Sequence, residues 1–224
     1  MDTATNTAAA ATVAGWPHLY QPGSEHAPVL LMLHGTGGNE HEIAALAKEL
    51  DPDAGVLAPR GPVTEQGMLR WFRRHGEGNF DVDDVIARSG DLAGFLEAVR
   101  EHYTLGERPV IAVGFSNGAN IALATAMLHP GTLGHVIAFS GMYPFGDREL
   151  SADLAGTSLL VLNGDADPMA PLPSVSTLLA ALASHGASAE QVLRPGGHGI
   201  QYTDLAAARD WLTRPPTKQQ TTPH

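Results

Sequence analysis

The stretch VIAVGFSNGANIAL, residues 110–123, decides the fold of this chain. Its first four residues are apolar and mostly β-branched, which is typical of a strand buried on both faces of a sheet. Gly114-Phe115-Ser116-Asn117-Gly118 comes next, and the residues after it favour a helix. At so tight a corner, side chains on the two flanking glycines would collide with neighbouring backbone. The stretch therefore predicts a serine hydroxyl lifted clear of the sheet, beside helical N–H groups that favour a developing anion.

Composition and net charge exclude several classes of protein and of binding partner. The chain has 224 residues, of which 43% are hydrophobic and 17% charged, as expected for one globular domain. Its net charge of −11 disfavours nucleic acid or an anionic membrane as a main partner. The absence of cysteine excludes disulfides and a thiolate nucleophile, and it fits a cytoplasmic protein. No apolar run approaches the ~20 residues of a membrane span, so we expect no membrane insertion. The oligomeric state stays open, a homodimer included.

Apolar runs alternate with amphipathic segments along the chain. We expect a disordered leader over 1–15, a single domain over 16–214 and a disordered tail over 215–224. The expected strands are 16–21 (an edge strand), 29–33, 56–58, 110–113, 136–139, 159–162 and 191–193. The expected helices are 40–50, 82–103, the segment after Gly118, 174–184 and one through Leu212 with Thr203 as its N-cap. Residues 60–80 are expected to be irregular.

Strands that alternate with helices predict an α/β fold, with a mostly parallel sheet flanked by helices on both faces. The predicted elements use most of the chain, which leaves no room for a large lid domain. In such sheets ligands bind beyond the carboxyl ends of the strands. Four loops follow predicted strands: 34–39, 114–118, 163–168 and 195–199. They should therefore converge on one site.

These loops carry the groups that acyl transfer by a serine needs. Such a reaction requires a base that takes the serine proton and an acid that orients the base. His198 lies in a glycine-flanked loop after the last strand and is the candidate base for Ser116. The acid is Asp167 or Asp165. We favour Asp167, because Pro168 fixes the backbone after it, whereas Asp165 could cap the turn with its own carboxylate.

The oxyanion of such a reaction needs preorganised N–H donors. One should be the backbone N–H of Asn117, the residue after the serine. The other should come from the glycine-rich loop after Leu33, with Thr36 as first choice and Gly37 as second. His34 is expected to hold this loop by hydrogen bonds. The spacing of His34, His198 and the aspartates fits no zinc motif, so we expect no metal and no cofactor.

Residues 70–74, Arg-Trp-Phe-Arg-Arg, form the most unusual remaining stretch. One interpretation places Trp71 and Phe72 against the substrate, with the arginines attracting an anionic group and with Met142 and Tyr143 on the opposite wall. The alternative is a loop that two aromatic side chains anchor in the core.

Six short segments together resemble the phospholipase/carboxylesterase family of α/β-hydrolases, which includes the acyl-protein thioesterases. They are Leu33-His34-Gly35-Thr36-Gly37-Gly38-Asn39, Pro59-Arg60-Gly61-Pro62, Arg70-Trp71-Phe72, Gly114-Phe115-Ser116-Asn117-Gly118-Ala119-Asn120, Gly164-Asp165-Ala166-Asp167-Pro168-Met169-Ala170-Pro171 and Gly196-Gly197-His198-Gly199. The resemblance implies an α/β-hydrolase fold and a cofactor-free esterase. It also implies the triad Ser116, Asp167 and His198, with Thr36 and Asn117 as oxyanion donors.

The chain departs from the thioesterase-like branch at two of these segments. That branch usually has Gly-Phe-Ser-Gln-Gly, whereas this chain has Asn117; it also has Leu-Gly-Asp where this chain has Thr-Gly-Gly-Asn. Both oxyanion donors are backbone groups, so the mechanism should survive the changes. We expect a serine carboxylesterase for small, short-acyl or aromatic esters. The alternatives are a thioesterase or lysophospholipase, an amidase or peptidase, and a hydrolase-like binding protein without catalysis.

Overall fold

The structure, a computed structural model, describes residues 11–149 and 151–214. Its centre is an eight-stranded sheet in the order β1-β2-β4-β3-β9-β10-β11-β12, in which all pairs from β4 to β12 are parallel. The strands are β1 (Ala11–Val13), β2 (Trp16–Gln21), β3 (Val29–Leu33), β4 (Gly55–Pro59), β9 (Val110–Phe115), β10 (His135–Phe139), β11 (Ser158–Gly164) and β12 (Ser188–Arg194). The predicted α/β class with a mostly parallel sheet is confirmed.

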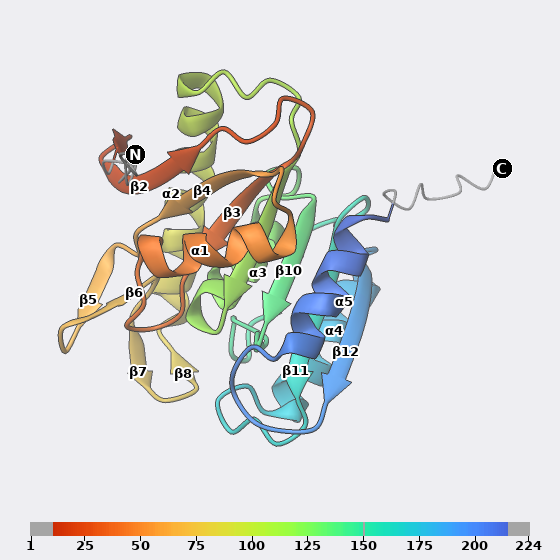
Figure 1. Ribbon diagram of the computed structural model, residues 1–224. Coiled ribbons are helices and arrows are strands. Elements are labelled where there is room, and N and C mark those ends of the chain that lie inside the picture. Colours follow the sequence, from red (N-terminus) through yellow and green to blue (C-terminus); the bar gives the residue numbers. More distant parts are fainter. Residues whose placement is uncertain (1–10, 150, 215–224) are drawn as a thin grey trace, which may run out of the picture.

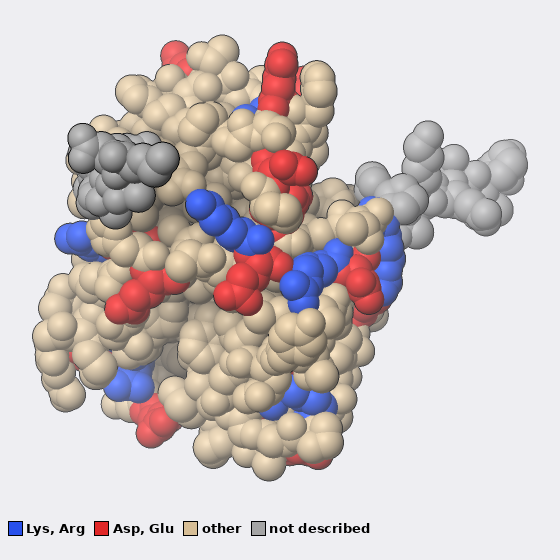
Figure 2. All heavy atoms as spheres, in the orientation of Figure 1, with Lys and Arg blue, Asp and Glu red and all other residues tan. Residues whose placement is uncertain are grey.

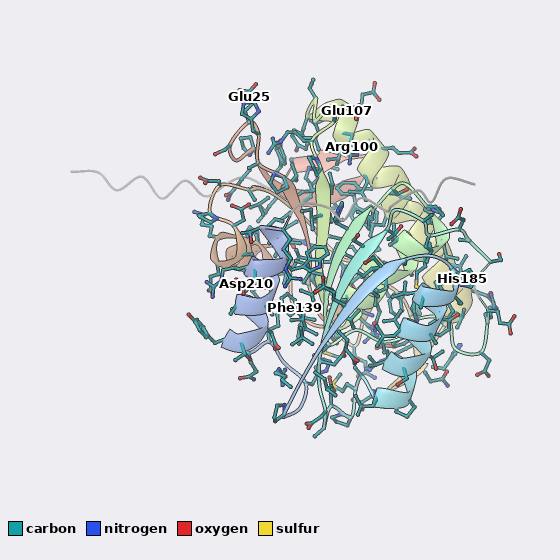
Figure 3. The ribbon with its side chains drawn as sticks, turned by 90° about the vertical axis from the view of Figure 1, so that its right-hand side faces the viewer. Glu25, Arg100, Glu107, Phe139, His185 and Asp210 are labelled. Carbon is teal, nitrogen blue, oxygen red and sulfur yellow. The ribbon has the colours of Figure 1, made fainter. Side chains whose placement is uncertain are left out.

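In the part of the chain that the structure describes, five helices cover the two faces of the sheet (Figure 1). They are α1 (Glu40–Leu50), α2 (Val82–His102), α3 (Asn117–Leu128), α4 (Leu172–Ser184) and α5 (Tyr202–Leu212). α1 and α5 lie on one face, and α2, α3 and α4 on the other. Figure 3 shows α5, with Asp210, and α4, which ends before His185, on opposite sides of the strands. The sheet is therefore the middle of three layers, and residues 11–149 and 151–214 include no large lid domain.

Strand β3 shows why the apolar runs form the middle layer. All five of its residues are fully buried. Leu31 and Leu33 pack in the core under α2 and α3, while Leu30 and Met32 pack with Ile43 of α1. Side chains alternate between the faces of a strand, so a strand covered on both faces must be apolar throughout.

Three expectations about local structure are wrong: those for residues 11–13, for Thr203 and for residues 60–80. Residues 11–13 were expected in the disordered leader, but they form β1, which pairs antiparallel with β2 and takes the edge position. Helix α5 begins at Tyr202, so its N-cap is Gln201, and the Gln201 N–H donates to Asp204 Oδ2 at 2.9 Å. Thr203 lies inside the helix. The expectations for residues 1–10 and 215–224 fall outside the described residues.

The segment 60–80, expected to be irregular, holds two β-hairpins. They are β5 (Val63–Glu65) with β6 (Met68–Arg70), and β7 (Arg74–Gly76) with β8 (Asn79–Phe80). The turn between β5 and β6 places Gln66 at φ 52° and Gly67 at φ 78°, as a two-residue type I′ turn requires. Strands of two or three residues are too short to show an alternating pattern, which is why the sequence gives no clear sign of them.

The surface that carries α1 and α5 mixes acidic and basic side chains, and the basic groups stand apart from one another (Figure 2). Over residues 11–149 and 151–214, none of the helices combines the length and the apolarity needed to cross a bilayer.

Candidate active site

Ser116 occupies a strained corner between β9 and α3. Its backbone has φ 53° and ψ −115°, a conformation that costs a non-glycine residue on the order of 1–3 kcal/mol. A Cβ on Gly114 would lie 2.5 Å from the carbonyl oxygen of Gly118, and one on Gly118 would lie 2.0 Å from the oxygen of Leu33. The two glycines are therefore required by close backbone contacts, as the sequence analysis predicts, and the serine is fixed at the carboxyl edge of the sheet.

His198 and Asp167 meet at the same edge. His198 Nδ1 lies 2.7 Å from Asp167 Oδ2, and the Asp167 side chain is fully buried. The other oxygen of Asp167 accepts hydrogen bonds from the backbone N–H groups of Met169, at 2.8 Å, and Ala170, at 3.2 Å. The His198 ring also lies 5.1 Å from the ring of Phe115, the residue before the serine. The carboxylate is thus fixed at both oxygens, and it orients an imidazole beside the Ser116 corner.

Asp165 contacts the backbone of the His198 loop, whereas Asp167 contacts the His198 ring. Its Oδ1 accepts a hydrogen bond from the N–H of Gly196 at 2.9 Å, and the N–H of Ala166 donates to the Gly196 carbonyl at the same distance. These bonds join the 163–168 turn to the loop that carries His198. The geometry favours Asp167 as the partner of the histidine, and Asp165 holds the loop.

Arg194 also holds the His198 loop, and the sequence analysis missed it. Its guanidinium donates to Asp204 Oδ2 at 2.7 Å and to the carbonyl oxygens of Gly197, at 3.3 Å, and Gly199. This pair is almost fully buried. Three of the four residues 196–199 are glycines, so the loop has little rigidity of its own and depends on such contacts. The sequence signal that could have identified it is its position: Arg194 is a charged residue at the carboxyl end of the last strand, β12.

The glycine-rich loop after β3 is held by residues of β6. The Gly37 N–H donates to the Leu69 carbonyl at 2.9 Å, so this donor is already engaged. Arg70 Nη1 donates to Thr36 Oγ1 at 3.0 Å. Within the described ranges the N–H of Thr36 has no acceptor, and the N–H of Asn117, at the first position of α3, has none within its helix. Both predicted oxyanion donors therefore remain free to bind.

His34 has the structural task that the sequence predicts for it. Its Nε2 accepts a hydrogen bond from the Gly61 N–H at 2.9 Å, so its proton sits on Nδ1, 2.8 Å from the Gly35 carbonyl. Burial lowers the pKa of His34 below its ordinary value, because the buried site disfavours the charged ring. Burial lowers the pKa values of His18 and His135 in the same direction.

This burial predicts a loss of stability on mild acidification. Below pH ~6.5, the ordinary pKa of histidine, the unfolded chain binds protons that the folded chain excludes. The free energy of unfolding should therefore fall as the pH drops from 7 towards 5. His34→Gln keeps an acceptor for Gly61 and removes one such ring, so the pH slope should decrease by at most ~1.4 kcal/mol per pH unit. Urea unfolding of the wild type and the variant at several pH values measures this slope. A slope that is the same in both proteins would show that groups other than His34 cause the loss of stability in acid.

The structure corrects the predicted substrate contacts of Trp71 and Phe72. Both side chains are fully buried in the core, and neither lines the cavity that contains Ser116 or the groove beside that cavity. Trp71 Nε1 donates to the His34 carbonyl at 2.8 Å, and the Trp71 N–H donates to Asn117 Oδ1 at 2.7 Å. Trp71 thus ties the glycine-rich loop to the serine corner. The alternative interpretation, a segment anchored by two aromatic residues, describes the structure.

Met142 and Tyr143 lie beside the cavity that contains Ser116, and their contact with a substrate stays a prediction. They line a groove of about 710 Å³ together with the β7–β8 hairpin and the start of α4. A smaller cavity, of about 30 Å³, contains Ser116 and Asn117 and shares Glu77, Gly78 and Phe80 with the groove. Both lie at the carboxyl edge of the sheet, where the β7–β8 hairpin is seen in Figure 1. The serine therefore opens into a narrow space beside a wider one.

The sequence profile of the phospholipase/carboxylesterase family matches residues 15–214. This chain belongs to that family. It is a carboxylic ester hydrolase of the serine hydrolase type, built on the α/β-hydrolase fold.

Individual members of the phospholipase/carboxylesterase family show the extent of the similarity. MhqD of Bacillus subtilis (strain 168), named as a hydrolase, is 39% identical over 194 residues, which cover 87% of this chain and 96% of MhqD. The crystal structure of a Bacillus cereus carboxylesterase superimposes with a TM-score of 0.84 at 36% identity, covering 89% of this chain and 94% of that one. Acyl-protein thioesterase 1 of Saccharomyces cerevisiae is 27% identical over 162 residues, which cover 64% of this chain and 71% of the thioesterase.

Proposed function

We propose that this protein is a serine carboxylesterase that hydrolyses small esters, with short acyl or aromatic groups, through an acyl-enzyme. The observation that carries the proposal is the 2.7 Å contact between His198 and Asp167 beside the strained corner at Ser116. A histidine held by a buried carboxylate next to a half-buried serine is the arrangement that activates a hydroxyl as a nucleophile.

Each residue then has one role. His198 takes the proton of Ser116, whose oxygen attacks the ester carbonyl. The N–H groups of Thr36 and Asn117 hold the oxyanion, and Asp167 stabilises the imidazolium. The alcohol leaves with the proton from His198, and water repeats the steps on the acyl-enzyme. These groups complete the reaction without a cofactor. A cytoplasmic location stays a prediction.

The space around the serine supports small substrates. The cavity of about 30 Å³ cannot accept a long acyl chain, and the groove of about 710 Å³ beside it is open to solvent along the β7–β8 hairpin. Hydrolysis of p-nitrophenyl esters from acetate to palmitate tests this. The value of kcat/KM should be highest for acetate to butyrate and should fall with chain length. A maximum at palmitate, or no turnover of any ester, would contradict the proposal.

The second candidate is a thioesterase, which the similarity to acyl-protein thioesterase 1 supports. It uses the same groups, so the site geometry does not separate the two. A matched pair of substrates does: the ester and the thioester of the same short acid, compared by kcat/KM. A large preference for the thioester would favour this second function.

A further inference from the structure

Two arginines line the small cavity that contains Ser116. Arg70 ends β6, and Arg74 begins β7. The Arg70 side chain is only 3% exposed, and that of Arg74 is 24% exposed. Two guanidinium groups beside a nucleophile are costly to bury, because both lose hydration and repel one another. This placement therefore requires an explanation.

The contacts of Arg70 and Arg74 leave much of their hydrogen-bonding capacity unused. Arg70 donates from Nε to the Phe72 carbonyl at 3.3 Å and from Nη1 to Thr36 Oγ1 at 3.0 Å. Arg74 donates from Nε to Glu65 Oε2 at 2.9 Å. A guanidinium has five N–H donors. Within the described residues, Nη2 of Arg70 and both terminal nitrogens of Arg74 have no acceptor.

The negative charge near the two arginines is incomplete. Glu65 is shared between them, with its Oε2 2.9 Å from Arg74 Nε and 3.7 Å from Arg70 Nε. No other carboxylate among the described residues lies within 4.0 Å of either group. Glu77 also lines the cavity, but it is exposed and screened by solvent. The inner part of the cavity thus holds two positive charges against one negative charge, and burial and Arg74 lower the pKa of Arg70 accordingly.

We propose that the unused donors of Arg70 and Arg74 bind a carboxylate of the substrate, so that the preferred substrates are short esters with a free carboxylate a few bonds from the scissile carbonyl. The inference rests on the proposed esterase function and specifies its substrate class. Ser116 and both arginines line the same cavity of about 30 Å³. This small volume limits the distance between the scissile carbonyl and the carboxylate of the substrate. Planar guanidinium groups suit this task, since they bind carboxylates through paired N–H donors.

The test compares two esters of equal size that differ in charge: monomethyl succinate and methyl succinamate, in which an amide replaces the carboxylate. Methanol release gives kcat/KM for each. The wild type should prefer the charged ester by at least about tenfold, as expected for hydrogen bonds to a charged group. In Arg74→Gln this ratio should fall to near one. Arg73→Gln is the matched control and should keep the wild-type ratio, because Arg73 is 63% exposed and pairs with Asp81 and Asp84.

A wild type that hydrolyses methyl succinamate as well as monomethyl succinate, or better, would overturn the inference and leave the esterase proposal intact. So would a preference that Arg74→Gln retains. The wild-type ratio carries the test alone if the variant does not fold. Failure of both esters and of every p-nitrophenyl ester would instead overturn the esterase proposal itself.

Discussion

Replacement of Ser116 by alanine is expected to lower kcat for short p-nitrophenyl esters by on the order of 10⁶-fold, the size of effect seen when a triad nucleophile is removed. The variant keeps the backbone corner, since only the hydroxyl is lost, and the oxyanion donors Thr36 and Asn117 should still bind the ester. The residual rate would therefore measure the catalysis that comes from binding and orienting the ester, without attack by a serine oxygen. Circular dichroism would establish that the fold is retained. Activity that survives in Ser116→Ala would remove Ser116 from the mechanism.

The same assay distinguishes the two aspartates of the 163–168 turn. In Asp167→Asn, Oδ1 can still accept from Met169 and Ala170, which leaves an NH₂ group facing His198 and stabilises the wrong tautomer. A loss of about 10⁴-fold in kcat is expected. Asp165→Asn is the matched control, because an amide oxygen can accept from the Gly196 N–H as the carboxylate does. It should retain most of the activity. The reverse order of effects would assign the acid to Asp165.

The largest expected effect on stability is that of Gly118→Ala. The new Cβ would lie 2.0 Å from the Leu33 oxygen and 2.5 Å from the His34 oxygen, both backbone atoms at the end of a fully buried strand. Neither can move without separating α3 from β3, so we expect a loss of more than about 4 kcal/mol in the free energy of unfolding, or no folded protein.

Gly94→Ala is the control for the Gly118 substitution. Gly94 also lies within a helix, α2, and a Cβ there meets nothing within 4 Å. Alanine at an exposed helical position should raise the free energy of unfolding by roughly 0.5–1 kcal/mol. Urea unfolding of both variants measures the contrast. A Gly118→Ala protein as stable as the wild type would show that the helix can shift at this corner.

The sequence alone predicts the frame of the fold and the location of the candidate site. Buried strands such as β3 and β9 must be apolar on both faces, and this requirement is visible in every residue of the run. The carboxyl ends of parallel strands share an edge, so the order of elements places Ser116, Asp167 and His198 near one another. The collision of any side chain at Gly114 or Gly118 is likewise a property of the local corner, and the sequence predicts it correctly.

Only the tertiary structure decides which side chains face the substrate. Trp71 is buried because its two N–H groups bond to His34 and Asn117, which are 37 and 46 residues away. Arg70 turns inwards because Thr36, 34 residues away, accepts its hydrogen bond. The separate tasks of Asp165 and Asp167 depend on acceptors and donors in the His198 loop, 31 residues away. The pattern of apolar residues within a segment shows whether that helix or strand is buried. The contacts described here instead join elements that are distant in the chain, and the residues that make them come together only once the sheet has formed.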